Sequence, residues 1–176
     1  MLVLVTAAGC GHREEQTRKA NTSPNADILD EMNQASAWFH AKKVRPIWVR
    51  KLGKGDTVKT IEGTERVKAG DFLCRGEAGD VWPQKAMSLN EKYQPTQEVN
   101  AGGWHKYVPR PDSQGVMAAQ VQHAFTVHAK WGLLSGKAGD YMVKNFADQD
   151  VSYPDDVWIV DQKLFRATYE AVARKP

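Results

Sequence analysis

KAGDFLCRGEAGD (Lys68–Asp80) and KAGDYMVKNFADQD (Lys137–Asp150) are nearly the same phrase, and this repetition decides the predicted fold. The offset that aligns Lys68 with Lys137 also matches Val58 with Val127 and Gly63 with Gly132. With small gaps the alignment continues through Asp80-Val81 with Asp150-Val151, Pro83 with Pro154, and Tyr93 with Tyr169. Because the matches keep their order over a whole unit, the sequence predicts an internal duplication.

The Ala-Gly-Asp of each phrase is typical of a tight turn. Gly70 and Gly139 permit a positive φ, and the side chains of Asp71 and Asp140 can accept hydrogen bonds from nearby backbone amides. The residues that follow alternate like a half-buried strand. We therefore interpret these four residues as structural. The alternative, in which Asp71, Asp80, Asp140 and Asp150 pair as catalytic acid and base, is the weaker one, and no catalytic residue is predicted.

The remaining patterns predict a fold class and its segments. Ser23-Pro24 is typical of a helix start, and apolar residues at helical spacing favour a helix over residues 24–42. Residues 43–103 form the first unit and residues 104–176 the second, each ending in a short helix near 85–93 and 161–173. We predict an α+β protein in which the N-terminal helix precedes two duplicated β-rich units. About 50 residues per unit is marginal alone, so the units should share one core.

The N-terminus resembles a secretory signal. Residues 1–9 are apolar and end in small residues, and Ala7-Ala8-Gly9-Cys10 is similar to the lipoprotein box, in which the cysteine is acylated. Residues 10–23 would be a polar tether, leaving Cys74 as a lone buried thiol. The predicted location is the periplasmic side of a bacterial cell envelope, with the lipid as membrane anchor. The alternative is a cytoplasmic protein whose first strand is LVLV.

The second unit resembles the PGDYG family of small domains from phages and bacteria. The resemblance rests on AGDYMVKN, on Tyr153-Pro154, and on the ending LFRATYE at residues 164–170, with Ala138 in place of the family's proline. Lys42-Lys43-Val44-Arg45-Pro46 is similar to the family's basic opening. The resemblance covers the second unit clearly and the first more weakly. It implies a fold and carries no activity, so no functional residue is transferred from it.

The net charge and the spacing of the histidines bear on two kinds of site, a nucleic-acid interface and a metal site. The net charge of +3 is small for a nucleic-acid binder, although residues 42–68 hold nine Lys/Arg against three Asp/Glu. His123 and His128 are five apart, which places them on opposite faces of a strand and about 140° apart on a helix. We therefore predict neither a metal site nor a cofactor.

Aromatic residues supply the candidate contacts. Trp48, Trp82, Trp104 and Trp131 could stack on sugars or bases, although large aromatics more often fill a small β core. Trp104 lies in the glycine-rich stretch AGGWHKY, so Trp104, His105 and Lys106 are predicted as exposed ligand contacts.

These patterns favour a non-catalytic, lipid-anchored envelope protein that binds a protein or glycan partner. One alternative is a cytoplasmic, phage-type accessory protein that binds nucleotide or nucleic acid through residues 42–68. A second alternative is an envelope hydrolase with paired Asp residues.

Overall fold

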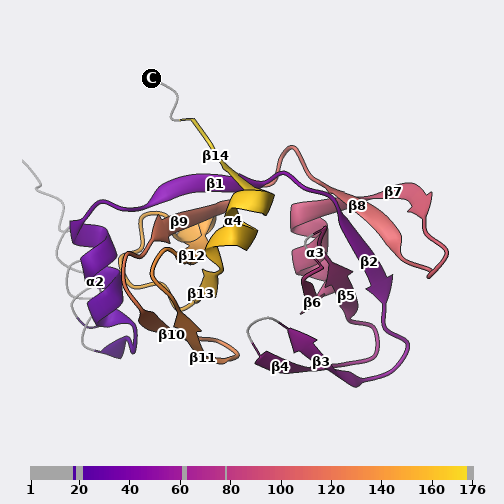
Figure 1. The fold of residues 1–176 in the computed structure, drawn as a ribbon, viewed down its shortest axis with the longest axis horizontal. Helices are drawn as coiled ribbons and strands as arrows, with labels where there is room; N and C mark the ends of the chain where they lie inside the picture. Colours follow the sequence, from indigo (N-terminus) through magenta and orange to yellow (C-terminus); the bar gives the residue numbers. More distant parts are fainter. Residues whose placement is uncertain (1–17, 19–21, 61–62, 78, 174–176) are drawn as a thin grey trace, which may run out of the picture.

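The computed structural model describes residues 18, 22–60, 63–77 and 79–173, and it shows two lobes side by side (Figure 1). Strands account for 43% of the structure and helices for 19%. Each lobe holds a five-stranded antiparallel sheet, a two-stranded hairpin and a short helix next to the sheet. The α+β prediction is therefore wrong, because the fold is predominantly β.

Lobe 1 contains the strand order β6-β5-β2-β8-β7 and the hairpin β3-β4. Its elements are β2 (Ile47–Lys51), β3 (Asp56–Thr60), β4 (Gly63–Val67), β5 (Phe72–Arg75), β6 (Val81–Gln84), α3 (Ala86–Lys92), β7 (Tyr93–Val99) and β8 (His105–Pro109).

Lobe 2 contains the strand order β13-β12-β9-β1-β14 and the hairpin β10-β11. Its elements are α2 (Ala26–Gln34), β1 (Phe39–Lys43), β9 (Val116–Gln120), β10 (Phe125–Ala129), β11 (Gly132–Gly136), β12 (Tyr141–Asn145), η1 (Phe146–Asp148), β13 (Val157–Val160), α4 (Gln162–Thr168) and β14 (Tyr169–Ala171).

The helix predicted over residues 24–42 is much shorter than expected. Helix α2 ends at Gln34, and Ser36 adopts φ 50°, a left-handed conformation that does not continue a helix. The apolar residues that follow belong to strand β1, whose Ala41 is fully buried between two neighbouring strands. The helical spacing of Phe39 with α2 is therefore coincidental.

The two lobes repeat each other element by element. The offset that aligns Lys68 with Lys137 also aligns the first residues of β2, β3, β4 and β5 with those of β9, β10, β11 and β12. Beyond this point a larger, again constant offset aligns β6 with β13, α3 with α4, and β7 with β14. The structural equivalent of Asp80-Val81-Trp82 is thus Asp156-Val157-Trp158. The sequence alignment had paired Asp80-Val81 with Asp150-Val151. That pairing is wrong, because the segment between β12 and β13 is longer than the segment between β5 and β6.

The lobes exchange one strand each. Strand β1 precedes lobe 1 in the chain but pairs with β9 and β14 of lobe 2. Its equivalent β8 pairs with β2 and β7 inside lobe 1. The register is the same in both lobes, because Ala41 of β1 pairs with Val116 of β9, and the equivalent residue Tyr107 of β8 pairs with Ile47 of β2. The chain crosses between the lobes at residues 44–46 and again at residues 110–115. Pro46 favours an extended crossing, because a residue before proline avoids the helical region.

The buried cores lie within the lobes, so the predicted shared core is also wrong. Helix α3 covers the inner face of the lobe 1 sheet and buries Leu89 with Ile47 and Val49. Helix α4 covers the equivalent face of lobe 2 and buries Phe165. The opposite face of the lobe 2 sheet is covered by α2, through Leu29 and Met32, and by the hairpin β10-β11. The inner faces, with α3 and α4, both lie toward the middle of the molecule (Figure 1).

Candidate functional site: a cleft between the lobes

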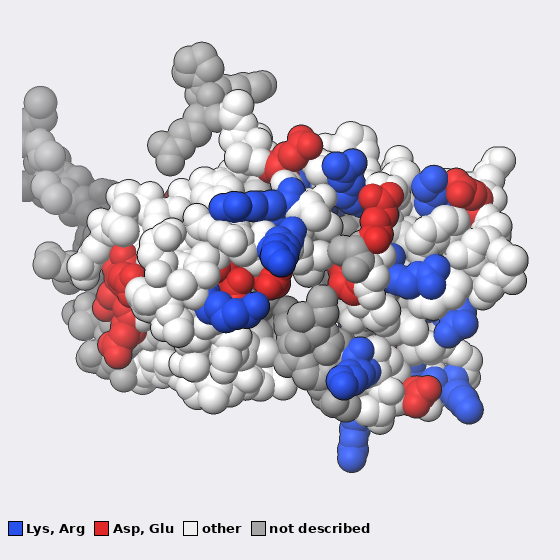
Figure 2. Space-filling view, viewed as in Figure 1, with Lys and Arg blue, Asp and Glu red and all other residues white. Residues whose placement is uncertain are grey.

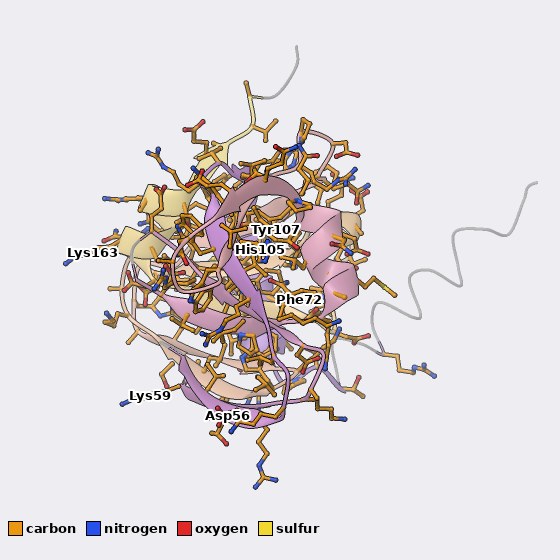
Figure 3. All side chains as sticks on the ribbon, turned by 90° about the vertical axis from the view of Figure 1, so that its right-hand side faces the viewer. Asp56, Lys59, Phe72, His105, Tyr107 and Lys163 are labelled. Atoms are coloured by element: carbon orange, nitrogen blue, oxygen red, sulfur yellow. The ribbon has the colours of Figure 1, made fainter. Side chains whose placement is uncertain are left out.

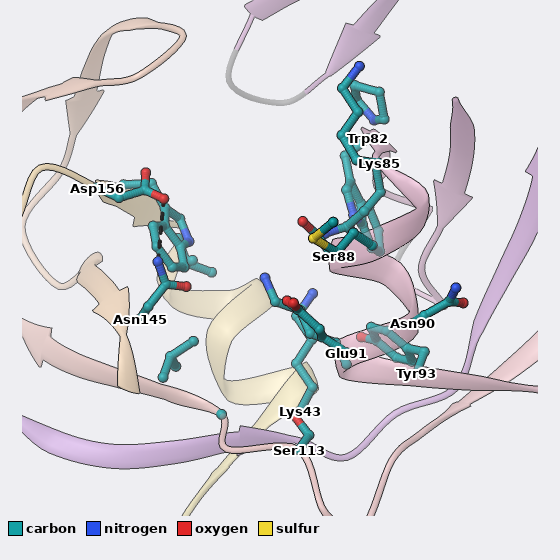
Figure 4. Close-up of a pocket in the computed structure, with 18 of the residues that line it drawn as sticks. Lys43, Trp82, Lys85, Ser88, Asn90, Glu91, Tyr93, Ser113, Asn145 and Asp156 are labelled. Atoms are coloured by element: carbon teal, nitrogen blue, oxygen red, sulfur yellow. Dashed lines mark hydrogen bonds between the residues drawn. The ribbon is translucent and has the colours of Figure 1, made fainter. Parts of the chain in front are cut away.

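A cleft of about 1350 Å³ separates the inner faces of the two lobes. Its walls come from β6 and α3 of lobe 1 and from β13, α4 and the segment around Asn145 of lobe 2 (Figure 4). Concave sites that combine aromatic surface with a few polar groups are the usual form of a ligand site. The cleft is therefore the leading candidate in the described part of the chain.

Three residue types occur at equivalent positions of both walls. Lobe 1 contributes Asp80, Trp82 and Tyr93, and lobe 2 contributes the equivalent residues, which are Asp156, Trp158 and Tyr169. Both tryptophans are half-buried. Sequence reasoning missed Trp158 as a site residue, although the tripeptide Asp-Val-Trp occurs in both units and was the available signal.

A lysine from the opposite side lies over each tryptophan. The ammonium nitrogen of Lys43, at the end of β1, is 4.7 Å from the Trp82 ring centroid and 5.3 Å from that of Tyr169. The ammonium nitrogen of Lys92, at the end of α3, is 6.0 Å from the Trp158 ring centroid. Burial lowers the pKa of Lys92. The two lysine–tryptophan contacts join one lobe to the other and so connect the two walls.

Three residues that line the cleft each have a buried polar atom that lacks a hydrogen-bond partner among the described residues. These atoms are Asp80 Oδ1, the Tyr93 hydroxyl and Asp156 Oδ1. Burial raises the pKa of Asp80, and burial also raises that of Tyr93. An unsatisfied buried polar atom costs roughly 1–3 kcal/mol. The three atoms are therefore the least satisfied polar groups of the residues that line the cleft.

The lining as a whole combines apolar side chains with polar ones, some of which Figure 4 labels, and its five Lys/Arg are balanced by five Asp/Glu. Its neutral polar groups include Ser88, Asn90, Ser113 and Asn145. Three of its carboxylates have cationic partners: Asp71 with Lys85 at 2.9 Å, Asp112 with Arg110 at 3.0 Å, and Asp156 with Lys130 at 3.2 Å. Such a surface suits a ligand that offers many hydrogen-bonding groups and apolar faces but little net charge.

The predicted turn residues form two equivalent turns, one in each lobe. Gly70 has φ 90° and Gly139 has φ 93°. The carboxylate of Asp71 accepts from the backbone amide of Lys68 at 2.8 Å, and that of Asp140 accepts from Lys137 at 2.9 Å. Asp140 also accepts from the amide of Gln162 at the start of α4. Both carboxylates thus bind backbone groups of their own lobe.

The three predicted contact residues divide between two faces of lobe 1. Trp104 is half-buried, with the guanidinium carbons of Arg50 and Arg75 4.7 and 4.9 Å from its ring centroid. Lys106 points to this same face and pairs with Glu98 at 2.8 Å. His105 is exposed on the other face, because neighbouring strand residues alternate. None of the three lines the cleft.

The predicted lipidation residue Cys10, the signal-like segment and most of the tether lie outside the described residues. No described helix has the length and apolar character needed to cross a bilayer. His123 is bound by Glu31 at 2.9 Å, and its pKa is raised by the hydrogen bond with the Ala124 carbonyl and by that carboxylate. Within the described ranges, no three His, Cys, Asp or Glu side chains gather as a metal site would require.

Comparison of the chain with models of protein families, with curated proteins and with solved structures gave no match. The geometry of the cleft therefore carries the functional argument.

Proposed function

We propose that the protein binds a glycan in the cleft between its lobes, without catalysis, while a lipid on Cys10 anchors it at the periplasmic side of a bacterial envelope. The observation that carries the glycan proposal is the pair of equivalent tryptophans, Trp82 and Trp158, in one cleft lined by both polar and apolar groups. Sugar rings present an apolar face to an aromatic ring and hydroxyl groups to surrounding amides and carboxylates. Two tryptophans suit a ligand with at least two rings.

We expect Trp82→Ala and Trp158→Ala each to weaken glycan binding about tenfold or more. Aromatic stacking contributes about 1–3 kcal/mol per stacked ring for nucleobases, and a sugar ring should gain a comparable amount. The measurement is calorimetric titration of the full chain with soluble oligosaccharides of N-acetylglucosamine and of glucose. Trp104→Ala is the matched control, because Trp104 lies outside the cleft.

Three results would count against the proposal. If neither oligosaccharide series binds, the glycan assignment fails. If Trp104→Ala weakens binding as much as the cleft variants, the site is misplaced. If new reducing ends appear during the titration, and their release is lost in Asp80→Asn, the protein is the hydrolase of the second alternative.

The anchor is tested separately. Protein expressed in bacteria from the full gene should occur in the membrane fraction, with a mass that matches a chain starting at diacylated Cys10. Cys10→Ala should move it to the soluble fraction, because a lipid chain contributes about 0.8 kcal/mol of membrane affinity per buried methylene. A soluble, unmodified wild-type chain would contradict the envelope location and leave the glycan site untouched.

A further inference from the structure

The outer face of lobe 1 is chemically different from the outer face of lobe 2, although the two are structurally equivalent. In lobe 2 this face is covered by α2, and Ala119, Met142 and Ile159 are buried beneath it. In lobe 1 no described helix lies over the face, which is turned toward the viewer in Figure 3 with β2 across it. The equivalents of these three residues are Arg50, Leu73 and Pro83, and none of them is buried.

One contact is common to both outer faces. In lobe 2 the Lys144 ammonium lies 4.8 Å from the ring centroid of Trp38. The equivalent pair in lobe 1 is Arg75 with Trp104, at 4.9 Å. Lys144 is 1% exposed and donates hydrogen bonds to the carbonyls of Gln149 and Val151. The Lys144 ammonium group is therefore occupied by contacts within lobe 2 and is not available to a ligand.

Lobe 1 instead places two guanidiniums on one indole. Arg50 and Arg75 come from the paired strands β2 and β5, and Arg75 lies directly opposite Trp48, two residues before Arg50. Diagonal neighbours of this kind lie about 7–8 Å apart on the same face of a sheet. Among the described residues, neither arginine forms an ion pair with a carboxylate. Lys and Arg also gather over this lobe in Figure 2.

We propose that Arg50 and Arg75, whose guanidinium carbons lie 4.7 and 4.9 Å from the Trp104 ring centroid, form a binding site for a phosphate-type oxyanion. Two like charges so close repel each other, and an anion between them removes that cost. A guanidinium that contacts an aromatic ring and forms no ion pair has N–H donors available for two-point hydrogen bonding to an oxyanion. The phosphate could be free or the headgroup of an anionic phospholipid, since both present the same oxygens.

The first experiment titrates inorganic phosphate into the full chain carrying Cys10→Ala, with tryptophan fluorescence as the readout. Arg50→Ala and Arg75→Ala should each weaken binding at least tenfold. Lys59→Ala removes an exposed cation from the same lobe and should change it less than twofold. Arg75→Lys keeps the charge but loses the planar donor row, so it should also weaken binding. Equal losses in Lys59→Ala would mean general charge attraction and would overturn the site.

A second experiment separates the two phosphate sources. Vesicles of phosphatidylglycerol and phosphatidylcholine are sedimented with the same protein, with and without inorganic phosphate. Arginine-dependent binding to phosphatidylglycerol that phosphate does not displace identifies the headgroup, and displacement by phosphate identifies a free ligand. If neither phosphate nor vesicles bind, the proposal fails. It also fails if only a single-stranded oligonucleotide binds through these arginines.

Discussion

Phe165→Ala is expected to lower the free energy of unfolding by about 3–5 kcal/mol, one of the two largest effects foreseen for this chain. Phe165 is 4% exposed and stacks between two tyrosines, with ring centroids 3.9 Å from Tyr141 and 4.6 Å from Tyr169. Phe39 of the exchanged strand β1 meets it edge-on at 6.0 Å. The substitution thus opens a cavity where α4, β12, β14 and β1 meet. Denaturant unfolding followed by circular dichroism measures the loss.

The duplication supplies a matched control for this variant. The equivalent of Phe165 in lobe 1 is the fully buried Leu89, so Phe165→Leu places in lobe 2 a side chain that the fold already uses at this position. We expect Phe165→Leu to cost less than half as much as Phe165→Ala. Met87→Ala, on the exposed side of α3, should stay within about 0.5 kcal/mol of wild type. A loss below about 1 kcal/mol for Phe165→Ala would contradict the described packing.

The second large effect concerns the reactivity of Cys74. Burial raises the pKa of this thiol to about 12, and the residue is 0% exposed. Relative to an ordinary thiol with a pKa of about 8.5, its thiolate fraction at pH 8 falls by a factor on the order of 10³. In the Cys10→Ala variant, reaction with a disulfide reagent at pH 8 should therefore be at least about 10³-fold slower in native than in denatured protein.

The control for this measurement is a variant of the same protein in which the single thiol lies at an exposed position. Met87→Cys, combined with Cys10→Ala and Cys74→Ala, places a single cysteine at a position that is 75% exposed in wild type. It should react at nearly the same rate in native and denatured protein. Native Cys74 reacting within tenfold of this rate would show that β5 is not enclosed by β2, β6 and α3 as described.

The duplication could be predicted from the sequence, but only part of its register. The Ala-Gly-Asp phrases set the offset between the units correctly through β5 and β12. The segment after β12 is longer than the segment after β5, so the sequence alignment pairs Asp80 with Asp150, whereas the structure pairs Asp80 with Asp156. A search for the repeated tripeptide Asp-Val-Trp would have corrected this and would have placed Trp158 beside Trp82 in the candidate site.

The strand exchange could not be predicted from local patterns. Residues 39–42 were predicted as the end of the first helix, and even as a strand they could pair in either lobe, because β1 and β8 occupy equivalent places in equivalent sheets. Which lobe β1 joins depends on the direction that the chain takes between β1 and β2. That direction is set by the arrangement of the two lobes and not by the residues of β1. The same limit applies to Lys43, whose contact with Trp82 exists only because β1 ends at the boundary between the lobes.

The exchanged strands also bear on how far the cleft between the lobes can open or close around a ligand. Both crossings join interior strands, since β1 lies between β9 and β14, and β8 lies between β2 and β7. The ends of both crossings are therefore fixed by hydrogen-bonded ladders, and a change in the width of the cleft has to come from the backbone of residues 44–46 and 110–115. In the shorter crossing, Pro46 fixes its own φ and restricts Arg45, which limits the backbone angles that can change there. The less the walls have to move, the more of the conformational entropy lost on binding is the ligand's own.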